Sequence, residues 1–171
     1  ITRDQLIKEM VGRDVSAFAV RKRPRRFTEE VVLEVKGLSV EPTFRDVSFK
    51  LRKGEILGFA GLVGSKRTDV VRAIFGADQK TSGEVYLGGK KVEIATPEQG
   101  LAHGIGLIPE NRKTQGFVKT LNNADNMALA SLNKFTRRGF ISYPAKWDNC
   151  RTLGEATNLN TLDPEYLTEQ L

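Results

Sequence analysis

The chain has 171 residues and a mass of 19.0 kDa, the length of one domain or of one domain with a fragment of another. Hydrophobic residues make up 39% of the chain and charged residues 28%, which is enough apolar side chain for a core and argues against disorder. No apolar run approaches the roughly 18 residues of a membrane span, and the charged N-terminal segment is unlike a signal peptide. One cysteine and one histidine provide neither an internal disulfide nor a closed zinc site, so we expect a cytosolic protein.

The excess positive charge is concentrated in one short segment. The formal net charge is +6, and residues 21–26, Arg-Lys-Arg-Pro-Arg-Arg, carry five of these charges. A domain that grips a nucleic-acid backbone spreads its basic residues over a face, so we predict no nucleic-acid partner. We interpret the segment as a solvated linker, with contact to anionic lipid head groups as the alternative.

The first 27 residues predict a helix and a linker. Thr2 and Gln5 form a capping box, and apolar residues recur at helical spacing until Gly12. This pattern predicts a short amphipathic helix over residues 1–12. Residues 13–27 are polar and basic and predict a linker, so the main domain is expected to begin at residue 28.

The strand patterns of the main domain are of two kinds. Val31–Val35 and Val47–Leu51 predict two antiparallel strands, and Glu84–Ile94 alternates around two glycines as in a hairpin. The short apolar runs Ile56–Ala60 and Ile105–Ile108 predict buried strands. We expect the first run to be a strand that leads directly into a helix at Arg67–Phe75, and its absence as a strand would overturn the predicted fold and any family assignment that rests on it.

Four helices are predicted after residue 60. Arg67–Phe75 has an apolar side and ends at Gly76, a left-handed C-terminal cap. Thr96-Pro97-Glu98-Gln99 is a capping box that begins a helix ending by Gly104. Residues 122–132 and 144–159 show helical patterns with polar connections.

The segment between the run at 56–60 and the helix at 67–75 is a glycine loop. Such a loop directs backbone N–H groups toward an anion at the positive end of a helix. The usual motif is G-x-x-x-x-G-K-[ST]. Here Lys66 stands in place of the last glycine and Arg67 in place of the lysine, while Thr68 keeps the hydroxyl that contacts Mg²⁺. A glycine turn without any ligand is the alternative interpretation.

The chain resembles a known family in several segments. Their order and spacing are similar to those of nucleotide-binding subunits of bacterial ABC importers, above all the carbohydrate-uptake class with two fused ATP-binding domains. The matching segments are Val47-Ser48-Phe49, Arg52–Ile56, Gly58, Gly61–Gly64, Ser82–Val85, Pro97, Gly104-Ile105 and Pro109–Lys113. In the second domain of that class an arginine commonly replaces the loop lysine, and a Glu-Asp-Arg-Lys-like segment replaces the Q-loop glutamine. Lys66 departs even from this pattern.

The resemblance implies an α/β fold: a P-loop NTPase core of the ABC nucleotide-binding type, with an antiparallel β subdomain and a partial, truncated helical subdomain. Residues 28–171 would be the N-terminal part of that domain, and residues 1–12 the last helix of a preceding one. The cofactors would be ATP and Mg²⁺. The binding residues would be Gly61, Leu62, Val63, Gly64, Ser65, Lys66, Arg67, Thr68 and Glu110, with Thr68 at the metal.

The resemblance also implies partners and a reaction. The partners would be membrane permease subunits, the preceding domain of the same polypeptide and, indirectly, a periplasmic or extracellular sugar-binding protein, with the chain peripheral at the cytoplasmic face of the membrane. The family's Ser-Gly-Gly signature, catalytic glutamate and switch histidine would follow Leu171. We therefore expect a transport ATPase as the whole protein and no hydrolysis by this chain alone.

Alternatives remain for several features. Glu110 matches the Q-loop position, but it is also interpretable as a solvated carboxylate beside Arg112 and Lys113. Tyr143 and Trp147 are candidates for a patch that receives a coupling helix, or for packing within the helical region. At the level of function, the alternatives are a non-hydrolysing nucleotide-sensing or scaffold domain, and an importer of nucleosides rather than sugars.

Overall fold

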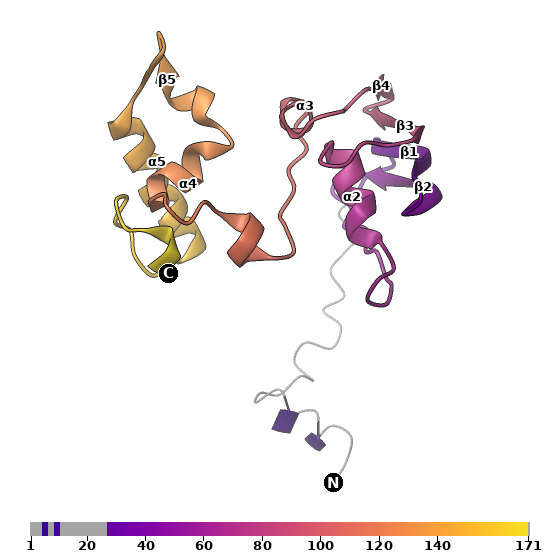
Figure 1. Cartoon of the computed structure of the whole chain (residues 1–171), viewed down its shortest axis with the longest axis horizontal. Coiled ribbons are helices and arrows are strands. Elements are labelled where there is room, and N and C mark those ends of the chain that lie inside the picture. The colour runs from indigo at the N-terminus through magenta and orange to yellow at the C-terminus, as the bar shows by residue number, and fades with distance from the viewer. Residues whose placement is uncertain (1–4, 7–8, 11–26, 171) are drawn as a thin grey trace.

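The computed structural model describes residues 5–6, 9–10 and 27–170. Gln5, Leu6, Glu9 and Met10 are helical, and the rest of the helix predicted over residues 1–12 lies outside the described residues. So does the predicted linker apart from Phe27, including the basic segment 21–26. Figure 1 shows the remaining elements in two groups joined by one stretch of chain.

The first group, here called the sheet lobe, contains an antiparallel sheet. Its strands are β1 (Val31–Val40), β2 (Phe44–Arg52), β3 (Ser82–Leu87) and β4 (Lys90–Val92), in the order β2-β1-β3-β4. All neighbouring pairs are antiparallel. The two early antiparallel strands and the Gly88-Gly89 hairpin are thus confirmed, and β1 and β2 are longer than their patterns predicted.

The core of the sheet lobe depends on an irregularity in β1. Val35 and Leu38 are three residues apart, so a regular strand would point them to opposite faces. The register shifts between them, and Gly37 has a φ of 59°, a conformation that glycine adopts at little cost. Val35 and Leu38 are therefore both buried, at 1% and 0% exposure.

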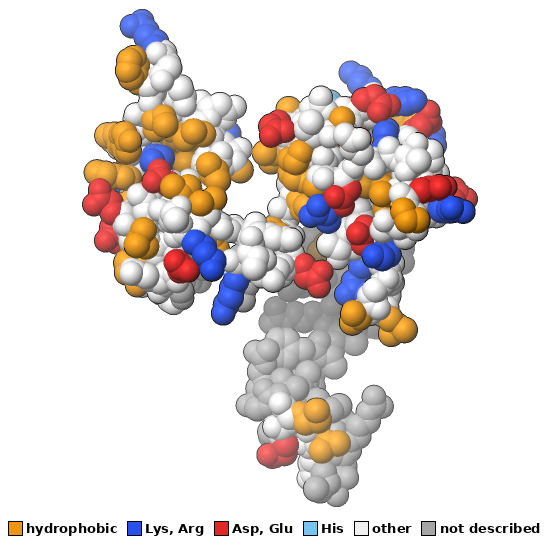
Figure 2. Space-filling view, viewed as in Figure 1, with side chains coloured by type: hydrophobic (Ala, Val, Ile, Leu, Met, Phe, Trp, Pro, Cys, Tyr) orange, Lys and Arg blue, Asp and Glu red, His pale blue; other side chains and the backbone are white. Residues whose placement is uncertain are grey.

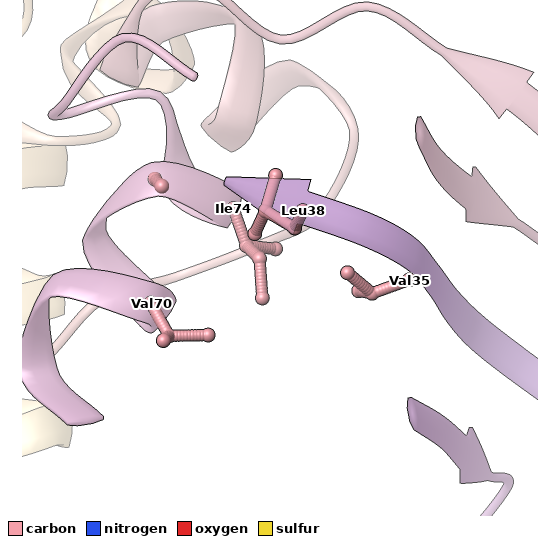
Figure 3. Packing of buried hydrophobic residues seen from close by; sticks show 5 residues of the cluster. Val35, Leu38, Val70 and Ile74 are labelled. Atoms are coloured by element: carbon pink, nitrogen blue, oxygen red, sulfur yellow. The ribbon is translucent and has the colours of Figure 1, made fainter. Parts of the chain in front are cut away.

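Helix α2 (Arg67–Phe75) covers this face of the sheet. Its residues Val70, Ala73 and Ile74 are buried against Val35 and Leu38 (Figure 3). The predicted bounds of this helix are confirmed, and Gly76 caps it with a φ of 85°. Helix α3 (Pro97–Ala102) begins at the predicted cap, where the Thr96 side chain accepts a hydrogen bond from the N–H of Gln99, and ends at His103.

The second group, here called the helical lobe, contains α4 (Asn123–Leu129), α5 (Tyr143–Thr157) and a small hairpin of β5 (Thr136–Arg137) and β6 (Phe140–Ile141). It also has 3₁₀ turns at Leu132–Phe135 and Thr168–Gln170. Helices α4 and α5 pack against each other and share an ion pair between Asp125 and Lys146, and the Lys146 side chain is only 4% exposed. Figure 2 shows a gap between the lobes and a narrow bridge that joins them. The chain that connects the two lobes contains the π-helical turn Arg112–Gly116.

Two predicted strands are absent. Residues 56–60 and 105–108 belong to neither sheet of the described chain. Ile56 and Ile108 are 98% and 91% exposed, although Phe59 stacks edge-to-face on Phe49 with 5.1 Å between ring centroids. A buried strand exists only where neighbouring strands satisfy its backbone, and no described strand lies alongside either run. The prediction that Ile56–Ala60 forms a strand was wrong.

Candidate functional site

The glycine loop is built by its backbone conformations. The N–H of Ser65 donates to the carbonyl of Leu62 at 3.0 Å and closes a turn. Gly64 has a φ of 86°, in the left-handed region that favours glycine, although a side chain there would have room. Lys66, the N-cap of α2, also has a positive φ of 65°. The position where the usual motif has its last glycine therefore keeps a glycine-like backbone while carrying a lysine.

The side chain of Arg67 is directed at the loop itself. Its Nη1 donates to the carbonyl oxygens of Gly61 and Leu62 at 2.5 and 3.3 Å, and lies 3.5 Å from Oγ of Ser65. Ser65 is so close to Gly61 that a Cβ at position 61 would lie 2.3 Å from the serine Oγ. Contacts among its own residues therefore hold the loop closed.

Thr68 meets a residue from a distant part of the sequence. Its hydroxyl donates to Oε2 of Glu110 at 3.2 Å. Glu110 stands on the stretch that joins the lobes, next to Asn111, whose side chain caps the π-helical turn. The structure thus places the predicted Q-loop carboxylate beside the predicted metal hydroxyl. Glu110 is exposed, as a solvated carboxylate would be, and it forms no ion pair with Lys113 within the described residues.

Three open cavities adjoin this contact, and the one of about 720 Å³ extends over Asn111 and Lys113. Two others lie closer to the loop and α2. One of about 260 Å³ is lined by Val63, Gly64, Lys66, Arg67, Thr68, Asp69 and Glu110. The other, of about 340 Å³, extends along α2 toward Leu107 and Gln115. These two cavities lie at the N-terminal end of α2, where the helix dipole favours negative charge.

The sequence reasoning missed Arg72, which lines the cavity of about 340 Å³. Arg72 makes two hydrogen bonds to the Asp78 carboxylate, at 2.7 and 2.8 Å. These bonds hold the pKa of Asp78 below its ordinary value and raise the pKa of Arg72. Arg72 lies four residues after Thr68 on α2, so helical periodicity could have found it. Gln115, which lines the same cavity, carried no comparable signal.

A family comparison matches most of the chain. The family described as ABC transporter matches residues 44–170, from the first residue of β2 to the end of the described structure. The chain belongs to the ABC transporter family.

Relatives within this family have names that refer to sugar import. The chain is 38% identical over its full length to a putative ribose/galactose/methyl galactoside import ATP-binding protein of Geobacillus kaustophilus, and covers 34% of it. It is 36% identical over 95% of its length to the ribose import ATP-binding protein RbsA of Bacillus subtilis, covering 32% of that protein. The chain therefore spans about a third of the length of these curated relatives.

Solved ABC structures share the fold. A nucleotide-free ATP-binding cassette from an ABC transporter superposes with a TM-score of 0.64 at 16% identity, over 82% of this chain and 59% of that one. A dimeric cassette bound to ADP and phosphate superposes with a TM-score of 0.61 at 20% identity, over 81% and 62% of the two chains. The fold is therefore that of an ABC ATPase, although the Ile56–Ala60 strand is absent here.

Two further residues of the predicted loop in this ABC chain have exposed side chains. Leu62 and Val63 are 86% and 101% exposed, so only their backbone belongs to the loop.

In the helical lobe of this ABC chain, the two aromatic residues near Pro144 differ in burial. Trp147 is half-buried, whereas Tyr143 is 58% exposed, with its ring centroid 4.7 Å from Nζ of Lys146. No described helix has the length and hydrophobicity needed to cross a membrane.

Proposed function

We propose that this chain is the first part of a nucleotide-binding domain that binds Mg-ATP and powers the import of a sugar. The observation that carries the proposal is the contact between Thr68 and Glu110 beside the glycine loop. In an ABC domain these are the phosphate-loop hydroxyl and the Q-loop position. A ligand-free glycine turn gives no reason for such a contact.

The residues at this site suit a nucleotide triphosphate and Mg²⁺. Backbone N–H groups of the loop and the N-terminal end of α2 are the donors that phosphates take in such loops. Thr68 and Glu110 offer oxygen atoms, the ligands that Mg²⁺ prefers. The described residues contain no group of three or more His, Cys, Asp or Glu side chains that could hold a metal by themselves. This agrees with an ion that takes its other ligands from phosphate oxygens and water.

Within the chain, the proposed roles are binding and communication. The loop would bind the phosphates, and the hydroxyl of Thr68 would contact the Mg²⁺ that accompanies them. Glu110 lies on the connection between the lobes, so its contact with the site can affect the placement of the helical lobe. When bound, Mg-ATP supplies the phosphoryl group whose transfer to water drives transport. The ADP and phosphate in the structurally similar dimeric cassette support a nucleotide as the ligand.

The cargo and the partners follow from the relatives. Their names refer to ribose and galactosides, which favours sugar over nucleoside import and favours a transport role over a scaffold. We propose permease subunits as the membrane partners, a sugar-binding protein as an indirect partner, and a position at the cytoplasmic face of the membrane. A preceding nucleotide-binding domain in the same polypeptide, ending with residues 1–12, fits relatives three times as long.

Two experiments test the proposal. NMR titration of the chain with Mg-ATP is expected to shift the amide signals of Gly64 to Thr68 with a dissociation constant of about 1 mM, equivalent to roughly 4 kcal/mol. Deletion of the whole gene from its host is expected to abolish uptake of one sugar, which the unaltered gene restores. If Mg-ATP shifts no loop amide, the loop is only a structural turn. If uptake of a nucleoside is lost instead, the sugar assignment is wrong.

A further inference from the structure

The two adjacent basic residues of the loop have different surroundings. Residues 66 and 67 both depart from the usual phosphate-loop motif, and the sequence alone gives no reason to assign them different roles. In the structure, one side chain is engaged with the loop and the other is not. This difference assigns each a function within the proposed nucleotide site.

Arg67 is held by the loop backbone. Its Nη1 donates to two carbonyl oxygens, those of Gly61 and Leu62, at 2.5 and 3.3 Å. Carbonyl oxygens at a sharp turn carry partial negative charge, and a guanidinium is a strong donor to such groups. A group engaged in this way stabilises the turn and has less donor capacity for a ligand.

Lys66 has the opposite character. It is exposed, and its ammonium makes no hydrogen bond or ion pair with any described residue. It lines the cavity of about 260 Å³ together with Arg67, Thr68 and two carboxylates, Asp69 and Glu110. Those carboxylates repel a polyphosphate that enters without Mg²⁺, so a cation at this cavity must offset them, and the Arg67 guanidinium is engaged with the loop carbonyls. Lys66 supplies a flexible point charge of that kind.

We propose that Arg67 is a positioning residue that holds the loop in its curved form from within, and that Lys66 is the residue whose charge meets the phosphates. The roles expected at these two positions of the motif are thus exchanged. This inference rests on the proposed function, because it names residues of the same nucleotide site.

The test uses the full 171-residue chain and three single variants. Lys66→Gln and Arg67→Gln each remove one charge at similar length, and Lys90→Gln removes an exposed charge on β4 as the matched control. Two quantities are measured: the affinity for Mg-ATP at low and high salt, and amide hydrogen exchange of residues 61–65 without ligand. Inorganic tripolyphosphate serves as a second anionic probe.

The expected results separate the two roles. Lys66→Gln weakens Mg-ATP binding by about tenfold at low salt and less at high salt, with loop exchange unchanged, since a screened charge is lost. Arg67→Gln speeds loop exchange by about tenfold in the ligand-free chain, because the hydrogen bonds that close the turn are gone. Lys90→Gln changes neither quantity.

Other outcomes overturn the inference or the function separately. If Arg67→Gln shows the salt-dependent loss and leaves loop exchange unchanged, the roles are not exchanged. If the unaltered chain binds tripolyphosphate but not Mg-ATP, the nucleotide assignment fails while the division of roles can still be read from tripolyphosphate. If it binds neither probe, the role of Lys66 is refuted, and the exchange data alone decide that of Arg67.

Discussion

The hydroxyl of Thr68 donates to Oε2 of Glu110 at 3.2 Å, and the two residues are 42 positions apart in the sequence. Thr68 belongs to the first turn of α2, whereas Glu110 belongs to the connection that leads to the helical lobe. A ligand that binds between these two oxygen atoms would therefore contact α2 of the sheet lobe and the connection to the helical lobe at the same time.

Removing either partner of this contact should weaken nucleotide binding. We expect Thr68→Ala and Glu110→Ala each to reduce the affinity for Mg-ATP by about tenfold, since each loses the side-chain oxygen suited to the metal. Thr68→Ser keeps the hydroxyl and should bind as the unaltered chain does. Calorimetry with and without Mg²⁺ measures the effect, and an equal loss in Mg²⁺-free titrations would contradict a metal role.

The backbone at Lys66 predicts a gain in stability. A non-glycine residue at a φ of 65° destabilises the folded state by about 1–2 kcal/mol. Glycine avoids this strain, but it loses more conformational entropy on folding, which offsets part of the gain. Lys66→Gly should raise the free energy of unfolding by about 0.5–1 kcal/mol in urea denaturation, whereas Lys66→Ala should not. The double variant Lys66→Gly with Arg67→Lys gives up the charge of Lys66 but supplies a compact ammonium at position 67 beside a glycine, as the usual motif does, and should bind Mg-ATP more tightly than the unaltered chain. Unchanged affinity would mean that the loop differs from a working phosphate loop by more than these two residues.

The ion pair between α4 and α5 should be costly to break from one side. Lys146 is buried, and its ammonium is paired with Asp125. Asp125→Ala should lower the free energy of unfolding by about 3 kcal/mol, because it leaves a buried charge without its partner. The double variant Asp125→Ala with Lys146→Met should recover most of this loss. Equal destabilisation in the two variants would show that packing, and not the unpaired charge, dominates.

Acid should destabilise the fold in part through Asp78. The hydrogen bonds from Arg72 hold the pKa of Asp78 below its ordinary value of about 4. The unfolded chain therefore binds more protons than the folded chain in this range, and stability present above pH 4 is lost as the pH falls further. Unfolding curves from pH 6 to pH 2 should show this decline, with a shallower decline for Asp78→Asn. Glu34 and Glu84, whose pKa values are also lowered, keep part of the slope in that variant.

The chain by itself should not hydrolyse ATP. Phosphoryl transfer depends on placed charges around the attacking water, and we identify no residue in the described site that positions that water. Steady-state phosphate release is expected at the level of buffer. Release that Thr68→Ala abolishes would prove this prediction wrong.

Local patterns predicted the elements that depend on nearby residues. The helix over Arg67–Phe75, its Gly76 cap and the Gly88-Gly89 hairpin all follow from turn chemistry and periodicity within a few residues. The runs at 56–60 and 105–108 were misread because an apolar run says nothing about which strand will satisfy its backbone. That information is non-local, and hydrophobicity does not contain it.

The same contrast between local and non-local information applies to the candidate site. The glycine loop and Thr68 were predicted from the order of neighbouring residues, whereas Glu110 was predicted only through the family resemblance. The direction of the Arg67 side chain could not be predicted, because a phosphate and a loop carbonyl are both acceptors that suit a guanidinium. Only the geometry of the closed turn distinguishes them.

The irregularity at Gly37 makes the burial of Leu38 depend on one backbone conformation. The strand has one residue more than a regular alternation between Val35 and Leu38 would use, and the positive φ of Gly37 accommodates it. Loss of the irregularity at the same chain length would turn Leu38 and every later residue of the strand over, with Leu38 facing water. Position 37 should therefore tolerate few substitutions, because most side chains disfavour a positive φ.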